Sequence, residues 1–146
     1  MWEDFVGRMM GLDVGTKTIG VAMSDPTRRL ASPVQTLKRR SVRLDTEVLI
    51  QLAEERGVDA FVVGLPLELD GTEERSARLA RQIGEAVRTA SGQPVHYVDE
   101  RYTSVEAERQ LIAADVSRAR RKQVIDQQAA VLILQALLDH PELDHE

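Results

Sequence analysis

The chain of 146 residues is long enough for one domain with a hydrophobic core, and its 42% hydrophobic and 29% charged residues are ordinary for a globular protein. It contains no cysteine, which excludes a disulfide framework and a thiolate metal site. No apolar run approaches the ~18 residues of a membrane span, and the start MWEDFVGRMM lacks the apolar region of a signal peptide. We therefore expect a cytoplasmic protein that does not associate with a membrane.

Strands are predicted first along the chain, at residues 8–14, 19–24 and 32–37. Only the tight turn Gly15–Thr18 separates the first two, so these are expected to pair in antiparallel fashion. The segment Leu44–Arg56 carries an apolar residue on every fourth position and is predicted to be a helix that ends at Gly57. The elements expected after it are a buried strand at 60–64, a helix at 72–89, a strand at 95–98, a helix at 103–113 that opens with a capping box, and an apolar helix at 124–138.

This order of elements predicts a mixed sheet, in which an antiparallel meander is extended by parallel strand–helix–strand units and covered by helices. Functional sites of open α/β sheets lie at the carboxyl ends of their parallel strands. The residues that follow each predicted strand are therefore the first candidates for chemistry.

Carboxylates from three distant segments are predicted to face the interior. Asp13 lies within the first strand, Glu100 follows the strand 95–98, and Asp126 lies on the apolar face of the last helix, since it precedes Ala130 by one turn. Like charges would repel one another in an apolar setting, and a hard cation resolves this. Mg²⁺ or Mn²⁺ accepts such ligands, and two such ions could activate water for phosphodiester hydrolysis.

Each acid also has a simpler explanation. Asp13 could cap the amides of the turn that follows it, and Glu100 and the preceding Asp99 could be ordinary loop acids. Asp126 could favour the positive end of its helix. The combination of the acids, rather than any one of them, indicates a metal site.

Basic residues are unevenly distributed, although the formal net charge of −5 does not by itself indicate a nucleic-acid partner. Residues 27–42 contain five basic residues and no acid, and residues 117–123 contain four and no acid. Such runs can neutralise phosphates, but more often they are solvated surface. The few aromatic residues argue against a base-stacking surface of the single-strand-binding type.

Four stretches of the sequence carry a specific resemblance to a known family. They are GLDVGTKTIGVAMSD (Gly11–Asp25), VVGLPLELDGTEERSARLAR (Val62–Arg81), VDERYTS (Val98–Ser104) and RRKQVIDQQAAVLILQALLD (Arg120–Asp139). Their order and spacing resemble the YqgF/RuvX family of small RNase H-like proteins, which are described as Holliday junction resolvases and as pre-16S rRNA 5′-end nucleases. The resemblance implies an α/β fold with a five-stranded RNase H-like sheet, three antiparallel strands extended by two parallel ones and flanked by helices.

The resemblance also implies a function and a site. It implies a metal-dependent nuclease that uses Mg²⁺ or Mn²⁺ at Asp13, Glu100 and Asp126, and that processes the 5′ end of pre-16S rRNA. The alternative is a Holliday junction resolvase, which needs a homodimer to make two symmetric cuts. The residues expected to bind nucleic acid are Lys17, Arg75, Arg101, Arg120, Arg121 and Lys122, although Arg101 could equally form a structural ion pair.

The expected organisation is an N-terminal extension at residues 1–7, a nuclease domain at 8–139 and an acidic tail at 140–146 that is expected to fray. Thr72 is expected to cap the helix 72–89. By strand alternation, Asp99 should point to the face opposite Glu100.

Two other classes of function compete with the nuclease. An ATP-binding domain of the actin and sugar-kinase type shares the sheet topology, but it builds its nucleotide cleft from two such domains. A non-catalytic nucleic-acid adaptor would not require the three acids.

Overall fold

The computed structural model describes residues 7–102 and 118–145. The side chains of Tyr102 and of residues 118–126 lie outside this description, as does the helix predicted at 103–113. Within the described parts of the chain, no helix combines the length and apolarity that a membrane crossing requires.

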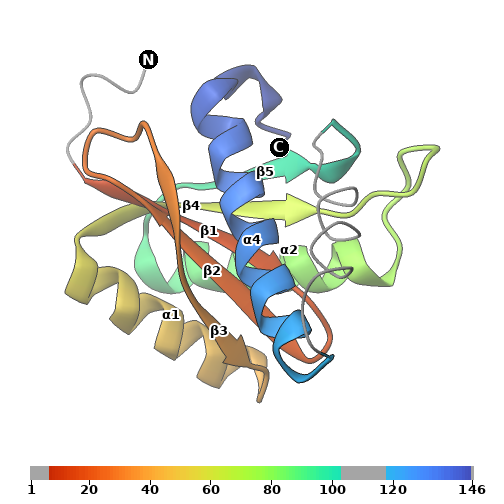
Figure 1. The fold of residues 1–146 in the computed structure, drawn as a ribbon, viewed down its shortest axis with the longest axis horizontal. Coiled ribbons are helices and arrows are strands. Elements are labelled where there is room, and N and C mark those ends of the chain that lie inside the picture. Colours follow the sequence, from red (N-terminus) through yellow and green to blue (C-terminus); the bar gives the residue numbers. More distant parts are fainter. Residues whose placement is uncertain (1–6, 103–117, 146) are drawn as a thin grey trace.

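One sheet with the strand order β3-β2-β1-β4-β5 forms the centre of the molecule (Figure 1). Its strands are β1 (Arg8–Val14), β2 (Thr18–Ser24), β3 (Ala31–Lys38), β4 (Val58–Leu65) and β5 (Val95–Asp99). β2 is antiparallel to β1 and to β3, whereas β4 is parallel to both β1 and β5. The predicted mixed sheet is confirmed.

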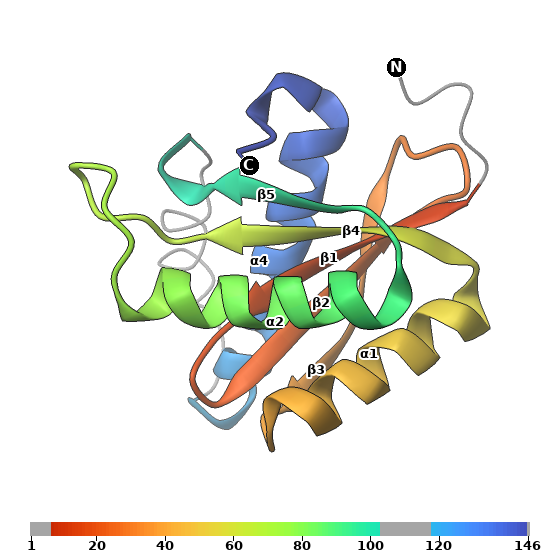
Figure 2. The ribbon, with the colours of Figure 1, turned by 180° about the vertical axis from the view of Figure 1, so that it is seen from behind.

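Helices cover both faces of this sheet. α1 (Val42–Arg56) and α2 (Arg75–Ser91) lie on one face (Figure 2), and α4 (Arg118–Asp139) crosses the other (Figure 1). The Ser41 hydroxyl accepts a hydrogen bond from the Leu44 amide at the start of α1, and α1 ends at Gly57 as predicted. Two short 3₁₀ helices follow β5 and α4: η1 (Glu100–Tyr102) and η2 (Pro141–Leu143).

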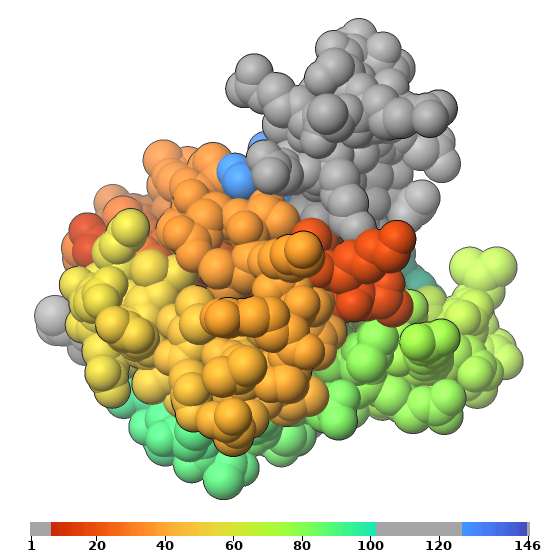
Figure 3. All heavy atoms as spheres, turned by 90° about the horizontal axis from the view of Figure 1, so that it is seen from below, coloured from red at the N-terminus to blue at the C-terminus, as the bar shows by residue number. Residues whose placement is uncertain are grey.

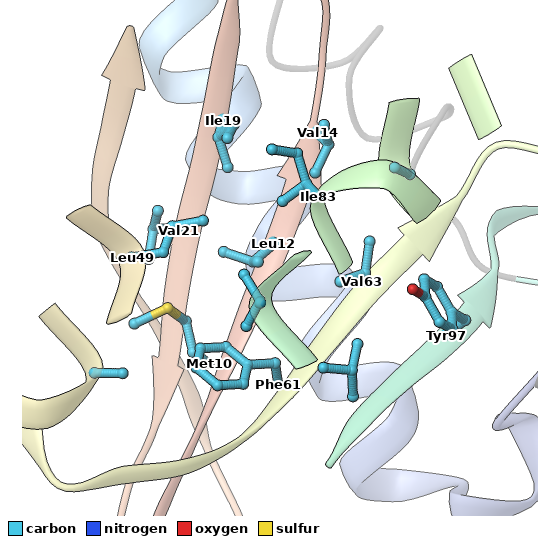
Figure 4. Packing of buried hydrophobic residues seen from close by; sticks show 14 of the residues in the cluster. Met10, Leu12, Val14, Ile19, Val21, Leu49, Phe61, Val63, Ile83 and Tyr97 are labelled. Atoms are coloured by element: carbon cyan, nitrogen blue, oxygen red, sulfur yellow. The ribbon is translucent and has the colours of Figure 1, made fainter. Parts of the chain in front are cut away.

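Strand alternation divides the buried side chains into two clusters. Met10, Leu12 and Val14 of β1 point toward α1 and α2, where they pack with Phe61 and Val63 of β4 (Figure 4). Met9 of the same strand belongs to the cluster beneath α4. Gly11 and Asp13 alternate with the first set, so they face α4.

The loop before α2 differs from the prediction. α2 begins at Arg75, with Glu74 at its N-cap, so Thr72 does not cap the helix. Instead, the carboxylate of Asp70 accepts hydrogen bonds from the amide and the hydroxyl of Thr72, at 2.9 and 2.7 Å. These local bonds satisfy Thr72 within the loop and delay the start of the helix.

The C-terminal residues lie against β5 rather than fraying as expected. Asp144 forms an antiparallel bridge with Val98, and the His145 amide donates to the Tyr97 carbonyl at 2.6 Å. The Asp144 carboxylate also lies 2.8 Å from Nδ1 of His96. β5 is an edge strand, and its outer backbone groups provide the partners that hold this segment.

Candidate active site

Asp13 lies near the carboxyl end of β1 and is 9% exposed. It is paired with Gly20 of β2, which leaves the side chain of Asp13 without a bulky neighbour on that strand. Gly11, two residues earlier, faces α4 closely enough that a Cβ there would lie 2.7 Å from Cβ of Leu134. Asp13 therefore points to the α4 face of the sheet.

Glu100 is the first residue after β5 and is half-buried. Its carboxyl group lies over Gly64 of β4, because a Cβ built on Gly64 would be 3.3 Å from Cδ of Glu100. The same Cβ would be 2.5 Å from Cδ1 of Ile133, a buried residue of α4. Glu100 thus shares the α4 face with Asp13.

Gly64 lies on β4, between the strand that carries Asp13 and the strand that precedes Glu100. The parallel register pairs Leu12 with Val63, so the next positions along the two strands, Asp13 and Gly64, are neighbours. With no side chain of its own, Gly64 leaves room for the Glu100 carboxyl group beside Asp13. In the sequence, Gly64 is the last residue of the predicted strand 60–64, and a glycine within a buried strand is a known sign of close approach.

Asp126 lies on α4, and its side chain is outside the described part of the structure. The neighbouring Gln127 donates a hydrogen bond of 3.2 Å to the Thr36 hydroxyl on β3. Thr36 pairs with Gly20, which in turn pairs with Asp13, so this turn of α4 crosses the sheet at the level of Asp13. Among the described residues, no group of three acids or histidines could hold a metal, and the third predicted acid falls outside that set.

Asp99 points to the opposite face from Glu100, as alternation predicts. It is 2% exposed and is held by Arg101, whose guanidinium lies 2.6 Å from one carboxylate oxygen and whose amide donates to the other at 2.9 Å. Burial opposes the charged form, but these hydrogen bonds and the charge of Arg101 keep the pKa of Asp99 below its usual value. Arg101 therefore forms the ion pair with Asp99 that the sequence offered as one of its two roles.

Two of the predicted phosphate contacts are exposed at the carboxyl-terminal end of the sheet. Lys17 lies in the β1–β2 turn, and Arg75 lies in the first turn of α2. Figure 3 shows this hairpin and the start of α2 beside each other on one side of the molecule. Arg39 braces the hairpin, since its side chain donates to the Gly15 carbonyl at 2.9 Å and its amide donates to the Lys17 carbonyl at 2.8 Å.

Not all basic residues of the two runs are exposed at this end of the sheet. Arg28 is buried and paired with Asp59, so it contributes to the fold rather than to a basic surface. Arg120, Arg121 and Lys122 lie on the first turns of α4, with side chains outside the described part of the structure.

The chemistry of Asp13 and Glu100 fits a hard divalent cation. Carboxylate oxygens are the ligands that Mg²⁺ and Mn²⁺ prefer, and one or two protein carboxylates leave coordination positions for water and phosphate. Two carboxylates brought to one end of the sheet, from β1 and from the residue after β5, are favoured by a cation that binds near them.

Comparison with known proteins gives relatives over most of the chain. Residues 7–140 match the protein family described as "RuvX: Holliday junction resolvase". A protein of Bradyrhizobium sp. strain BTAi1, named "Putative pre-16S rRNA nuclease", is 47% identical over 133 residues, which span 91% of this chain and 83% of the relative. A Moorella thermoacetica protein with the same name is 48% identical over 132 residues, which span 90% of this chain and 94% of the relative.

Solved structures share the fold at low sequence identity. RuvC of Thermus thermophilus in complex with a Holliday junction substrate aligns with a TM-score of 0.57 at 13% identity, over 93% of this chain and 96% of RuvC. The Fowlpox virus resolvase aligns with a TM-score of 0.51 at 11% identity, over 90% of this chain and 99% of that chain. The fold is therefore that of RuvC-like RNase H-fold proteins, and by its sequence the chain belongs to the RuvX (YqgF) family of nucleases.

Proposed function

We propose that this protein is a divalent-metal-dependent nuclease that hydrolyses phosphodiester bonds in structured nucleic acid, and that its substrate is the 5′ end of pre-16S rRNA. The observation that carries the proposal is the position of Asp13 and Glu100 on one face of the sheet, on either side of Gly64. Family membership, and the names of relatives that match over nine-tenths of the chain, support it.

The metal-binding residues in this proposal are Asp13, Glu100 and Asp126, with Mg²⁺ or Mn²⁺ as the cation. Bound there, the cation would supply an activated water and charge stabilisation for the leaving oxygen. Asp13 is suited to hold its ligand atoms still, because a central strand with neighbours on both sides fixes its backbone. Glu100 is oriented by the packing of Ile133 and by the absence of a side chain at Gly64.

Basic residues would hold the nucleic-acid backbone at the carboxyl-terminal end of the parallel strands. Lys17 follows β1 and Arg75 begins α2 after β4, and both are exposed and suited to contact phosphates. Arg120, Arg121 and Lys122 would extend this surface along the first turns of α4. We assign Arg101 to the support of Asp99 rather than to phosphate, because its guanidinium is already bidentate to that carboxylate.

A four-way DNA junction is the second candidate substrate, and the family description and the likeness to RuvC favour it. A resolvase cuts two strands symmetrically, so this alternative requires a homodimer that presents two sites to one junction. A monomer at the protein concentration of the assay would weigh against it.

Cleavage assays on both substrates test the proposal. A labelled precursor rRNA fragment and a labelled four-way junction are incubated with Mg²⁺ or Mn²⁺, and in parallel with a chelator. We expect cleavage of the precursor at the 5′ side of the 16S sequence with metal, and none with the chelator. Paired symmetric nicks in the junction, with an intact precursor, would favour the alternative. Failure to cut either substrate would contradict the nuclease proposal.

A further inference from the structure

We propose that Leu69 is a substrate-binding residue that packs against a nucleobase where the strands of the nucleic acid separate. This inference rests on the proposed nuclease function and adds a contact to bases at the same site. Leu69 is 95% exposed at the tip of the loop between β4 and α2. A single exposed leucine is common on protein surfaces, but Leu69 lies on an ordered loop that is bonded to the residue after Glu100.

The loop that presents Leu69 is a closed hairpin. The Gly71 amide donates to the Glu68 carbonyl at 2.8 Å, and the Glu68 amide donates to the Thr72 carbonyl at 3.0 Å. Gly71 adopts the left-handed conformation, with φ +89°, that a three-residue hairpin loop requires at this position. Leu67 is buried in the core below and anchors the loop. The exposure of Leu69 is therefore built into an ordered turn.

A second set of contacts fixes the tip to the candidate active site. Arg101 donates a hydrogen bond of 3.2 Å to the Leu69 carbonyl while it binds Asp99 with the rest of its guanidinium. Arg101 directly follows Glu100, so one side chain joins the loop tip to the strand end that carries the acid. Figures 1 and 2 show the loop projecting beyond the ends of β4 and β5, next to η1.

The charges of the loop favour a base over a phosphate as the partner of its tip. Glu68 and Asp70 flank Leu69 and would repel the backbone of a nucleic acid. Asp70 is turned back toward Thr72, whose amide and hydroxyl hold the pKa of this carboxyl below its usual value. Both acids are exposed, so the group at the tip that can contact a nucleic acid favourably is the side chain of Leu69, whose four carbons are suited to a base face.

The place of contact follows from the cost of reaching a base. Within a stacked duplex, an apolar side chain must first separate two base pairs, whereas at a branch or at the end of a stem a base face is already accessible. Both candidate substrates contain such a point. Leu69 would therefore select branched or terminal structures over uniform duplex.

The test measures base contact separately from cleavage. The fluorescent base 2-aminopurine is placed at the branch of a four-way DNA junction and at the end of an RNA stem, and in control molecules within an uninterrupted stem. Binding is followed with Asp13→Asn protein, with and without Leu69→Ser. We expect protein with Leu69 to change the fluorescence at the branch or stem end, and the Leu69→Ser variant to lose most of this change. Whichever probe responds, the DNA junction or the RNA stem, shows which nucleic acid supplies the base.

Cleavage provides the second readout, with active-site residues intact. Leu69→Ser should reduce cleavage at the branch or stem end by about tenfold, the scale of one lost base contact, and Leu69→Met should restore it. The matched control is Leu30→Ser, which replaces a second strongly exposed leucine of the described chain, 64% exposed in a turn at the opposite end of the sheet. Leu30→Ser should cleave like the wild type. The thermal midpoints of Leu69→Ser, Leu69→Met and Leu30→Ser should all equal that of the wild type.

Two results would overturn the inference, and they are distinguishable. If the wild type cleaves and Leu69→Ser matches it in both readouts, the leucine has another partner, such as a protein, while the nuclease proposal stands. If the wild type neither binds nor cleaves either nucleic acid, the proposed function fails and the inference fails with it.

Discussion

The two faces of the sheet hold their buried carboxylates in different ways. In the layer of α1 and α2, two buried acids of the described chain are paired with arginines: Asp45 of α1 lies 2.8 Å from Arg39, and Asp99 of β5 lies 2.6 Å from Arg101. On the face covered by α4, Asp13 and Glu100 come together across Gly64. The described contacts thus pair opposite charges in the first case and place two acids near one glycine in the second.

Under the proposed function, this difference separates groups that stabilise the fold from groups that bind a metal ion. A buried acid with a bidentate arginine meets its electrostatic requirement within the chain, and removal of either partner is costly. Acids of the same sign on one surface repel each other, and a divalent cation converts this cost into binding free energy. Substitutions on the first face should therefore change stability, whereas substitutions on the second should change activity.

Adjacent acids at the end of β5 provide the sharpest contrast. Glu100→Gln should reduce cleavage on the order of 100-fold, because it removes a metal ligand, and it should not lower the free energy of unfolding. Asp99→Asn is the matched control, since it makes the same kind of change one residue earlier on the opposite face. Equal losses of cleavage in the two variants, at equal stability, would break the distinction between the faces.

Gly64→Ala should change both properties. Its new Cβ would overlap Ile133 and press on the Glu100 carboxyl group, so we expect about 1–3 kcal/mol of destabilisation from overpacking and about a tenfold loss of cleavage. Gly84→Ala is the control, because its Cβ would overlap the Tyr97 ring on the other face, away from the acids. If both variants lose stability equally and both retain full cleavage, Gly64 has only a packing role.

Asp99 should contribute to stability in a pH-dependent way. Its pKa is lowered in the folded state, so its contribution is present above the unfolded value of ~3.9 and is lost as the pH falls through the folded value. Near neutral pH, Asp99→Asn should cost about 1–3 kcal/mol through the loss of buried charged hydrogen bonds. Denaturant titrations at several pH values should show this difference shrinking below pH ~4. A gap that stays constant down to acid pH would contradict the assignment.

Replacement of Arg120, Arg121 and Lys122 together by alanine should weaken binding severalfold and reduce the slope of log affinity against log salt by about 2 to 3. The control replaces Arg29, Lys38 and Arg40, which are exposed members of the other basic run. An unchanged slope in the first variant and a reduced slope in the control would indicate that the phosphates contact the residues around β3 instead.

Local patterns were sufficient to predict much of this arrangement. An apolar run predicted β1 at residues 8–14, and strand alternation predicted the opposite directions of Asp99 and Glu100; both predictions are confirmed. The mixed sheet followed from the order of the elements and agrees with the observed topology.

Features that depend on tertiary contacts could not be predicted in this way. The ion pair of Arg28 joins it to Asp59 on a distant strand, which only the folded chain brings near, so its basic run resembled open surface. The C-terminal residues were expected to fray because their acidic composition does not reveal that Asp144 meets an edge strand. The role of Gly64 depends on Ile133 and Glu100, which lie above it only in the folded chain.

Titration of Mn²⁺ into the wild type and into Asp13→Asn, followed by electron paramagnetic resonance of the free ion, tests the central claim most directly. We expect the wild type to bind Mn²⁺ and Asp13→Asn to bind it at least about tenfold more weakly, with an unchanged or higher thermal midpoint in the absence of metal. Equal Mn²⁺ affinity of the two proteins would contradict a metal site on the α4 face.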